Sequence, residues 1–391
     1  MPAMDTTAAL RAWLPGLKER APSARRAVRP PAPQGFIEGT LQRLFDAAPR
    51  VRIDAASRIV ILSDLHLGDG GPRDDFLHNA DLVQRVLREY YLRRGFALVL
   101  NGDIEELQRF RPRSIRERWG GLYTLFQGFE DRTGLYKIVG NHDEALLCDR
   151  DPSHPVEAQT TDSNLLEAVR FVSPEGTLFV FHGHQATIFF ERFNDVSGFF
   201  LRYVARALPV RNFAKAYESS KRFRTEHRAY SFASSRKIVS VIGHTHRPLF
   251  ESLSKIDTIR FRLEQLCRDY PAMSPYTRSA MEKIIIGYKQ ELDRLWAKDR
   301  ENGLRSSLYN DQISIPCLFN SGCAIGKRGV TALEIASGGI ALVSWYDRSR
   351  GERHFAETQG SGQPLDGTDY VRAVLKQDRL DYIFSRISLL A

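Results

Sequence analysis

Acidic, amide and imidazole side chains follow one apolar run after another in this chain. The stretch "RIVILSDLHLGD" opens with four aliphatic residues and then places Asp64 and His66 where a strand would end. Because one residue separates them, an extended chain points both side chains to the same side. A carboxylate and an imidazole held in this way can bind a divalent ion. Four later runs end in comparable groups, namely Asp103, Asn141 with His142, His182 with His184, and His244 with His246.

The collected donors are oxygen and nitrogen atoms, with no thiolate among them. The four cysteines show no CxxC spacing, which excludes a cysteine-rich metal site and favours a reduced compartment. A mixed set of this kind suits Mn²⁺, Fe or Zn²⁺ better than Ca²⁺ or Mg²⁺. It exceeds the needs of one ion, and ion pairs roughly 3.5 to 4 Å apart that share a carboxylate recur in phosphate-ester hydrolysis. We therefore expect two divalent ions, with Mn²⁺ preferred and Fe or Zn²⁺ as alternatives.

The elements that must position these donors are predicted to be strands. The runs "RIVILSD", "ALVLNGD" and "LYKIVGN" alternate with helical spacings, so residues 58–141 read as βαβαβ with parallel strands. In such sheets ligands bind beyond the carboxyl ends of the strands. The runs "TLFVFHGHQ" and "KIVSVIGHTHRP" repeat the design. Residues 315–347 predict antiparallel strands that complete a second sheet, and residues 368–386 predict a last amphipathic helix.

Two helical insertions are predicted, at about 187–236 and about 254–305. Each carries an apolar stripe at helical spacing, which favours packing as core. The first lies between two histidine-bearing strand ends, so it could also cover the site as a lid. Basic residues are frequent after its stripe. The stripes are Phe189, Phe193, Val196, Phe200 and Tyr203 in the first insertion, and Met281, Ile285, Tyr288, Leu292 and Leu295 in the second.

Composition and charge place the chain among globular proteins with a basic surface. Of 391 residues, 42% are hydrophobic and 26% are charged, and the net charge of +9 favours anionic partners. We expect residues 1–50 to form a partly disordered arm rich in Pro and Arg, 51–350 the main domain, and 351–391 a C-terminal extension with a terminal helix. No stretch has the apolar character of a secretory signal or a membrane span, so we expect a cytoplasmic protein.

Taken together, five blocks resemble the calcineurin-like metallophosphoesterase superfamily. Its pattern is DxH, GD, GNH[DE], H and GHxH, and this chain reads DLH, GD, GNHDE, HGH and GHTH between Asp64 and His246. The resemblance implies an α/β (α+β) fold, a four-layer αββα sandwich of two mixed β-sheets flanked by helices, with helical insertions near the active site. It also implies a hydrolase that cleaves a phosphate ester or pyrophosphate with a metal-activated water or hydroxide.

The resemblance further implies a role for each motif position. The first ion would be held by Asp64, His66 and His246, and Asp103 would bridge to the second ion. The second ion would be completed by Asn141, His182 and His244. His142, with Asp143 beside it, would be catalytic, protonating the leaving oxygen or stabilising the phosphoryl charge. For His184 and Glu106 a structural role is favoured.

The substrate is less defined than the reaction. "GHTHRP", "SDLHLGD" and the first insertion resemble the branch of the bacterial UDP-2,3-diacylglucosamine hydrolases. That branch implies a UDP-diacylglucosamine-type lipid precursor and peripheral contact with the inner membrane surface through the basic helical insertion. A phosphorylated small molecule is the broader expectation. The alternatives are a nuclease, a cyclic-nucleotide or protein phosphatase of the same superfamily, and a non-catalytic binding protein on this fold. The sequence leaves the oligomeric state open.

Overall fold

The computed structural model describes residues 34–150, 165–187, 219–253, 255–272, 274–301, 315–327, 329–350 and 362–391. Most of the predicted N-terminal arm lies outside this part of the chain. So do residues 188–218, which carry the apolar stripe and half of the Lys and Arg residues of the first predicted insertion.

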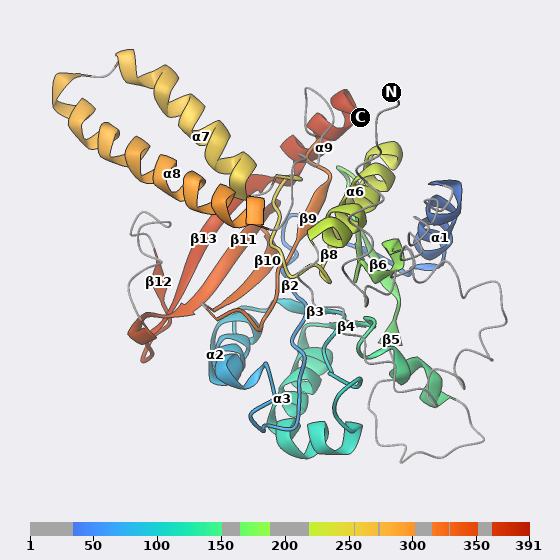
Figure 1. The fold of residues 1–391 in the computed structure, drawn as a ribbon. Coiled ribbons are helices and arrows are strands. Elements are labelled where there is room, and N and C mark those ends of the chain that lie inside the picture. Colours follow the sequence, from blue (N-terminus) through green and yellow to red (C-terminus); the bar gives the residue numbers. More distant parts are fainter. Residues whose placement is uncertain are drawn as a thin grey trace, which may run out of the picture. The chain divides into compact units, whose positions relative to one another are not determined.

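Two mixed sheets form the centre of the described chain (Figure 1). In spatial order, the five-stranded sheet contains β1 (Arg50–Arg52), β6 (Ala168–Val172), β7 (Thr177–Phe181), β8 (Val239–Ile242) and β9 (Leu318–Asn320). The eight-stranded sheet contains β12 (Gln363–Pro364), β13 (Tyr370–Arg379), β11 (Gly339–Asp347), β10 (Val330–Ala336), β2 (Ile59–Leu62), β3 (Ala97–Asn101), β4 (Leu135–Ile138) and β5 (Leu165–Leu166).

The two sheets pack face to face, and helices cover their outer faces. Between the sheets, the ring of Tyr136 on β4 meets Phe171 on β6 at 5.3 Å between centroids. On the outside of the five-stranded sheet, Phe45 of α1 (Gln34–Ala47) and Phe232 of α6 (Ser219–Arg236) both contact Phe179. On the outside of the eight-stranded sheet lie α2 (Ala80–Arg85), its π-helical continuation (Val86–Leu92) and α3 (Pro112–Arg132). The predicted αββα arrangement of two mixed sheets and flanking helices is confirmed.

The strand β2 explains why the first apolar run is unbroken. Ile61 belongs to the core between the sheets, whereas Val60 and Leu62 belong to the core beneath the outer helices. A strand buried on both faces needs apolar side chains at every position. The strands β2, β3 and β4 are parallel neighbours, as the βαβαβ prediction requires, and in the other sheet β7, β8 and β9 are parallel as well. Their carboxyl ends carry the predicted donors.

The C-terminal third differs from the prediction in two respects. The strands β10 and β11 are antiparallel, as expected, but they extend the sheet of β2 and do not complete a second one, while β9 joins β8 in the five-stranded sheet. The helix predicted over residues 368–386 is wrong in its first half, because residues 370–379 form β13 and only Leu380–Leu390 form a helix, α9. Buried and partly buried side chains alternate along the first half of β13, and its pairing with β11 overrides the helical spacing.

The second insertion contains two helices, α7 (Lys255–Asp269) and α8 (Pro275–Glu301), which lie side by side (Figure 1). Of the predicted stripe, Leu292 is buried. Ile286, which follows the stripe residue Ile285 and is not part of the stripe, is 54% exposed. No helix among the described residues is long and apolar enough to cross a bilayer. Short helical turns complete the described chain at Leu77–Asn79, Glu144–Arg150, His184–Ala186, Tyr270–Ala272 and Arg348–Arg350.

Candidate metal centre

Five of the predicted metal ligands have a left-handed backbone, which side chains other than glycine seldom adopt. The φ angles are 55° at Asp64, 50° at His66, 53° at Asp103, 61° at His244 and 54° at His246. Such conformations cost on the order of 1 to 3 kcal/mol each and persist where the surrounding structure imposes them. Backbone hydrogen bonds between neighbouring strand ends do so here, since the N–H of Asp64 donates to Gly102 O and that of His66 to Asp103 O, both at 3.0 Å.

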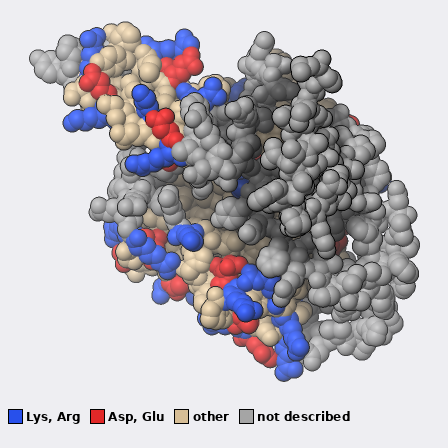
Figure 2. All heavy atoms as spheres, in the orientation of Figure 1, with Lys and Arg blue, Asp and Glu red and all other residues tan. Residues whose placement is uncertain are grey.

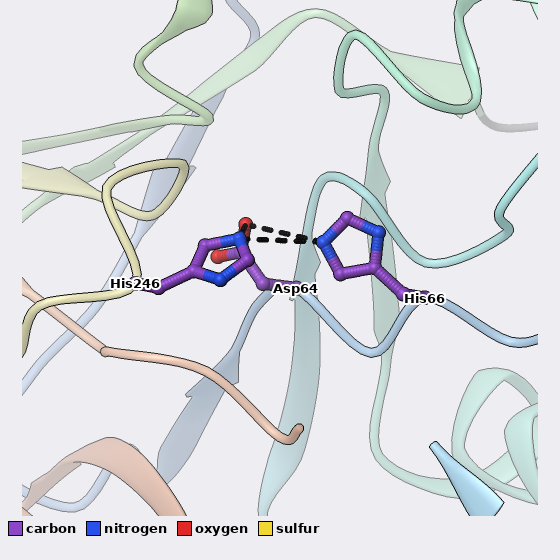
Figure 3. A group of neighbouring side chains, drawn as sticks. All are labelled: Asp64, His66 and His246. Atoms are coloured by element: carbon purple, nitrogen blue, oxygen red, sulfur yellow. Dashed lines mark hydrogen bonds and ion pairs between the residues drawn. The ribbon is translucent and has the colours of Figure 1, made fainter. Parts of the chain in front are cut away.

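The first group consists of Asp64, His66 and His246. The two imidazole rings turn their Nε2 atoms toward each other beside the carboxylate of Asp64 (Figure 3). His246 Nε2 lies 3.0 Å and His66 Nε2 lies 3.9 Å from Asp64 Oδ1, and the two Nε2 atoms are 3.3 Å apart. Two nitrogens that bind the same ion, each at about 2.1 Å, would lie roughly 3.0 to 3.4 Å apart. The spacing therefore fits a shared cation.

The second group consists of Asp103, His182 and His244. His182 Nδ1 contacts the carbonyl oxygen of Asn101 at 2.7 Å, which turns Nε2 toward Asp103 Oδ2 at 3.1 Å. Burial opposes the charged form of His182, but the carboxylate of Asp103 outweighs it and raises the pKa of His182 to about 10. Burial, together with the charge of His182, lowers the pKa of His244 to about 3. A neutral imidazole is the form that binds a metal.

Three buried polar atoms, belonging to Asp64, His182 and the predicted ligand Asn141, make no well-aligned hydrogen bond within the described part of the chain, although Asp64 Oδ1 lies 3.0 Å from His246 Nε2 and His182 Nε2 lies 3.1 Å from Asp103 Oδ2. They are Asp64 Oδ1, Asn141 Oδ1 and His182 Nε2. A buried polar atom without a hydrogen bond is costly unless another partner replaces it. A divalent cation would supply that partner for carboxylate, amide and imidazole alike, so the residues present fit the predicted ions.

The glycines of the motifs allow the strand ends to approach one another closely. A Cβ on Gly140 would lie 2.1 Å from Asp103 Oδ1 and 2.4 Å from Asp103 N. A Cβ on Gly102, where φ is 80°, would lie 2.4 Å from the ring of His182, and one on Gly243 would lie 2.8 Å from Asp64 Oδ2. Only glycine leaves room for these contacts. The glycines that precede Asp103, Asn141 and His244 are thus part of the site's geometry.

Glu106 connects the first group to His142. Its Oε2 lies 3.0 Å from His66 Nδ1, and its Oε1 lies 2.9 Å from His142 Nδ1. Burial would raise the pKa of Glu106, but the hydrogen bonds to the two imidazoles lower it to about 2. One carboxylate therefore orients two rings. The sequence favours a structural role for Glu106 and does not predict its contacts with the two imidazoles. The signal in the sequence for these contacts is the position of Glu106, three residues after Asp103.

Asp143 bonds to the backbone and not to a ring. Its carboxylate accepts the N–H groups of Gly140 at 2.6 Å and Ile104 at 2.7 Å, which ties the loop after β4 to the loop after β3. Burial, followed by the charges of Glu105 and Asp103, raises the pKa of Asp143 to about 7. The carboxylate that contacts His142 is thus Glu106. Asp143 supports the loop that carries His142, and the catalytic role expected for it beside His142 stays a prediction.

His142 and His184 occupy different surroundings. His142 donates its backbone N–H to Asp103 Oδ1 at 2.8 Å, and its Nε2 lies 4.0 Å from Asp103 Oδ2, so the ring borders both groups. His184 is buried beside His182, with 5.4 Å between ring centroids. Burial and the neighbouring His182 and His244 hold the pKa of His184 well below its usual range. The described metal groups do not include His184.

Comparison with known proteins adds little to this geometry. No protein-family model matches the sequence. No curated protein matches it either. Among solved structures, a single mutant of Vps29 from Entamoeba histolytica aligns over 82% of this chain and 99% of that chain, with 10% identity and a TM-score of 0.30. This level of similarity identifies neither a family nor an activity.

Proposed function

We propose that the chain is a binuclear metal-dependent phosphoesterase of the calcineurin-like metallophosphoesterase superfamily. Three clusters of possible metal ligands occur among the described residues, and the third, His66 with Glu106 and His142, overlaps the first. The observation that carries this proposal is the pair formed by the other two, Asp64 with His66 and His246, and Asp103 with His182 and His244. These are the groups that the sequence motifs assign to two separate ions. Buried polar atoms without well-aligned hydrogen bonds and a left-handed backbone at five ligands support the same assignment.

In the proposed site, Asp64, His66 and His246 would hold the first ion, Asn141, His182 and His244 would hold the second, and Asp103 would contribute to both. When bound, two divalent ions supply Lewis-acid polarisation of a phosphoryl group and activate a water for attack. The protein's contribution is to fix the donors, since strands of both sheets present them from converging ends.

His142 is the proposed catalytic residue. Glu106 contacts its Nδ1, so Nε2 is the atom left to face a substrate. Glu106 and Asp103 raise the pKa of His142 against the opposing effect of burial, which favours the protonated ring. An imidazolium at this position can stabilise charge on a phosphoryl oxygen or protonate the leaving oxygen.

The substrate class we propose is a phosphorylated small molecule or a lipid-linked pyrophosphate of the UDP-diacylglucosamine type. The support is the sequence of the GHTHRP block and the presence of an insertion between β7 and β8, of which the structure describes α6. A peripheral membrane contact through the basic part of this insertion belongs to the same proposal. A parallel assay of UDP-diacylglucosamine, a cyclic nucleotide, single-stranded nucleic acid and a phosphopeptide would separate this class from the alternatives.

The reaction class has a direct test. Purified protein reconstituted with Mn²⁺ should contain two ions per chain by elemental analysis and should hydrolyse bis-p-nitrophenyl phosphate or a related generic ester. Protein that retains no metal after reconstitution would contradict the proposed function. Two bound ions without hydrolysis of any phosphoester would instead indicate a binding protein on the same fold.

A further inference from the structure

The loop after β8 alternates between residues of the metal groups and residues that bond to one buried carboxylate. His244 and His246 belong to the second and first metal groups. Thr245 and Arg247, which alternate with them, both donate to the side chain of Glu226 on α6. Glu226 and Thr245 are buried, with 0% and 1% of their surface exposed. The ligand loop is therefore attached to a helix of the first insertion.

The attachment holds the loop from two sides. Thr245 Oγ1 donates to Glu226 Oε1 at 2.8 Å, and Arg247 donates to the same carboxylate through Nε at 3.2 Å and through Nη2. From the other side, Asn320 Nδ2 donates to Thr245 Oγ1 at 2.9 Å and to the carbonyl oxygen of Gly243 at 3.0 Å. Gly243, Thr245 and Arg247, which alternate with the two histidines, are thus each fixed by a side chain from a neighbouring element.

The strain in the loop explains why this attachment matters. His244 and His246 both have a left-handed backbone, which only a surrounding structure can impose. A bidentate bond between a guanidinium and a carboxylate is strong and directional. Removing the charge of Glu226 would replace the bidentate bond from Arg247 by a weaker one and would leave Thr245 with a weaker acceptor. The loop could then relax toward ordinary φ values and move both imidazoles.

We infer that Glu226 is a positioning residue for His244 and His246, and through them for both ions. The role assigned to the ions rests on the proposed function, whereas the role assigned to the loop rests on the contacts alone. It follows that α6, in the insertion between β7 and β8, is part of the support of the metal centre. Losing a group that orients metal ligands typically lowers metal affinity about 10- to 100-fold.

The test compares Glu226→Gln with a matched control, Glu334→Gln. Glu334 is buried and accepts a hydroxyl bond from Tyr91 and a bidentate bond from Arg372, so its chemistry matches that of Glu226. Glu334 lies on β10 and pairs with Val60 on β2. Val60 is four residues before Asp64, so Glu334 lies roughly 13 Å from the metal groups, measured along the strand. Both variants should unfold at a lower denaturant concentration than the unmodified protein. Comparing them with each other therefore corrects for the general cost of losing a buried ion pair.

Two measurements separate positioning from stability. Competition with a chromophoric chelator should show Zn²⁺ affinity lowered at least about tenfold in Glu226→Gln and unchanged in Glu334→Gln. In metal-free protein, hydrogen exchange in peptides that cover residues 243–249 should be faster in Glu226→Gln alone. If Glu226→Gln does not fold, Arg247→Lys keeps the charge but loses the bidentate geometry and should shift both measurements in the same direction.

The outcomes distinguish this inference from the proposed function. Faster exchange in the loop with weaker Zn²⁺ binding supports the positioning role. Unchanged exchange and affinity in Glu226→Gln would overturn it and leave the phosphoesterase proposal standing. Absence of Zn²⁺ binding in the unmodified protein would overturn the proposed function, and the exchange measurement would still decide the role of Glu226 in the loop.

Discussion

At the scale of single residues, the site separates groups that would hold ions from a group that would act on the substrate. Asp103 lies between its own metal group and His142, because its Oδ2 is 3.1 Å from His182 Nε2 and 4.0 Å from His142 Nε2. Burial would raise the pKa of Asp103, yet the imidazole of His182 keeps it well below the usual range. In the proposed role, Asp103 must be ionised, since it would be shared by two cations.

This difference predicts two distinct phenotypes. Asp103→Ala should abolish hydrolysis of a generic ester and remove most of the bound metal, because Asp103 is the donor that both ions would share in the proposed site. His142→Ala should lower kcat by about 10²- to 10⁴-fold, the usual contribution of a positioned acid, while the metal content stays near that of the unmodified protein. Metal analysis beside steady-state kinetics checks both expectations, and equal metal loss in the two variants would contradict the role given to His142.

The residues could be predicted from the sequence only where a motif names them. The five blocks point to the seven proposed ligands and to His142, since these lie at recognisable strand ends. Glu106 shares its carboxylate between His66 and His142, and this contact depends on how the loops after β2, β3 and β4 meet. Glu226 is more remote still, because it reaches the site from a helix whose sequence carries no motif. Contacts of this kind exist only in three dimensions.

At the scale of elements, the approach of the loops after β3 and β4 sets the spacing of the site. Gly140 is the point of closest approach, since a Cβ there would overlap both the backbone N and the carboxylate of Asp103. Asp143 bonds across the same junction to the N–H of Ile104. The junction leaves no room for a side chain, because the overlapping atoms include backbone and cannot rotate away.

We therefore expect Gly140→Ala to weaken the site far more than a glycine substitution normally would. The variant should bind at least about tenfold less metal at a fixed free-metal concentration, because Asp103 must move to admit the methyl group. Gly128→Ala in α3 is the matched control, since its Cβ would make an ordinary contact of 3.6 Å with Leu92. That variant should bind metal normally and gain about 0.5 to 1 kcal/mol of unfolding free energy. Equal metal binding by the two variants would contradict the close-approach argument.

The elements themselves were predictable to different degrees. Apolar runs that are buried on both faces marked β2, β3 and β8, since no exposed position interrupts them. Residues 370–379 do not identify themselves as a strand, because their apolar side chains fit a helical as well as a two-residue period. Pairing with β11 decides the matter, and a single sequence does not reveal that Tyr370 will lie opposite Asp347.

At the scale of the whole molecule, the described surface can be followed on one face, where the charge is spread and not gathered. On the face shown in Figure 2, basic and acidic side chains alternate over the described surface, including the helices of the second insertion. Several exposed arginines are paired with acids one helical turn away, as in Arg113 with Glu117 and Arg268 with Glu264. On this face the described residues therefore present no continuous basic track of the kind that follows a nucleic-acid backbone.

The second insertion leaves and re-enters the fold at neighbouring points. Ser252 Oγ donates to the carbonyl oxygen of Ile315 at 2.6 Å, and the N–H of Ser252 donates to Leu318 O. The helices α7 and α8 thus form an excursion from the fold. Its two ends are held together by the hydrogen bonds that Ser252 makes to Ile315 and to Leu318 of β9. Among their described residues only Ile259 and Leu292 are buried apolar side chains, so the excursion contributes little to the main core.

Replacing residues 254–314 by a short Gly-Ser linker should therefore leave the metal centre intact. No described residue of the two metal groups lies in this segment, and the loop closure that the linker replaces is entropically modest. We expect two ions per chain, cooperative unfolding and a kcat/KM for a generic ester within about threefold of the full-length value, because less than about 0.7 kcal/mol of transition-state stabilisation should depend on the segment. Selective loss of activity on a long-acyl substrate would assign α7 and α8 to substrate recognition. Loss of metal would show instead that the excursion supports the sheets, contrary to the sparse burial of its side chains.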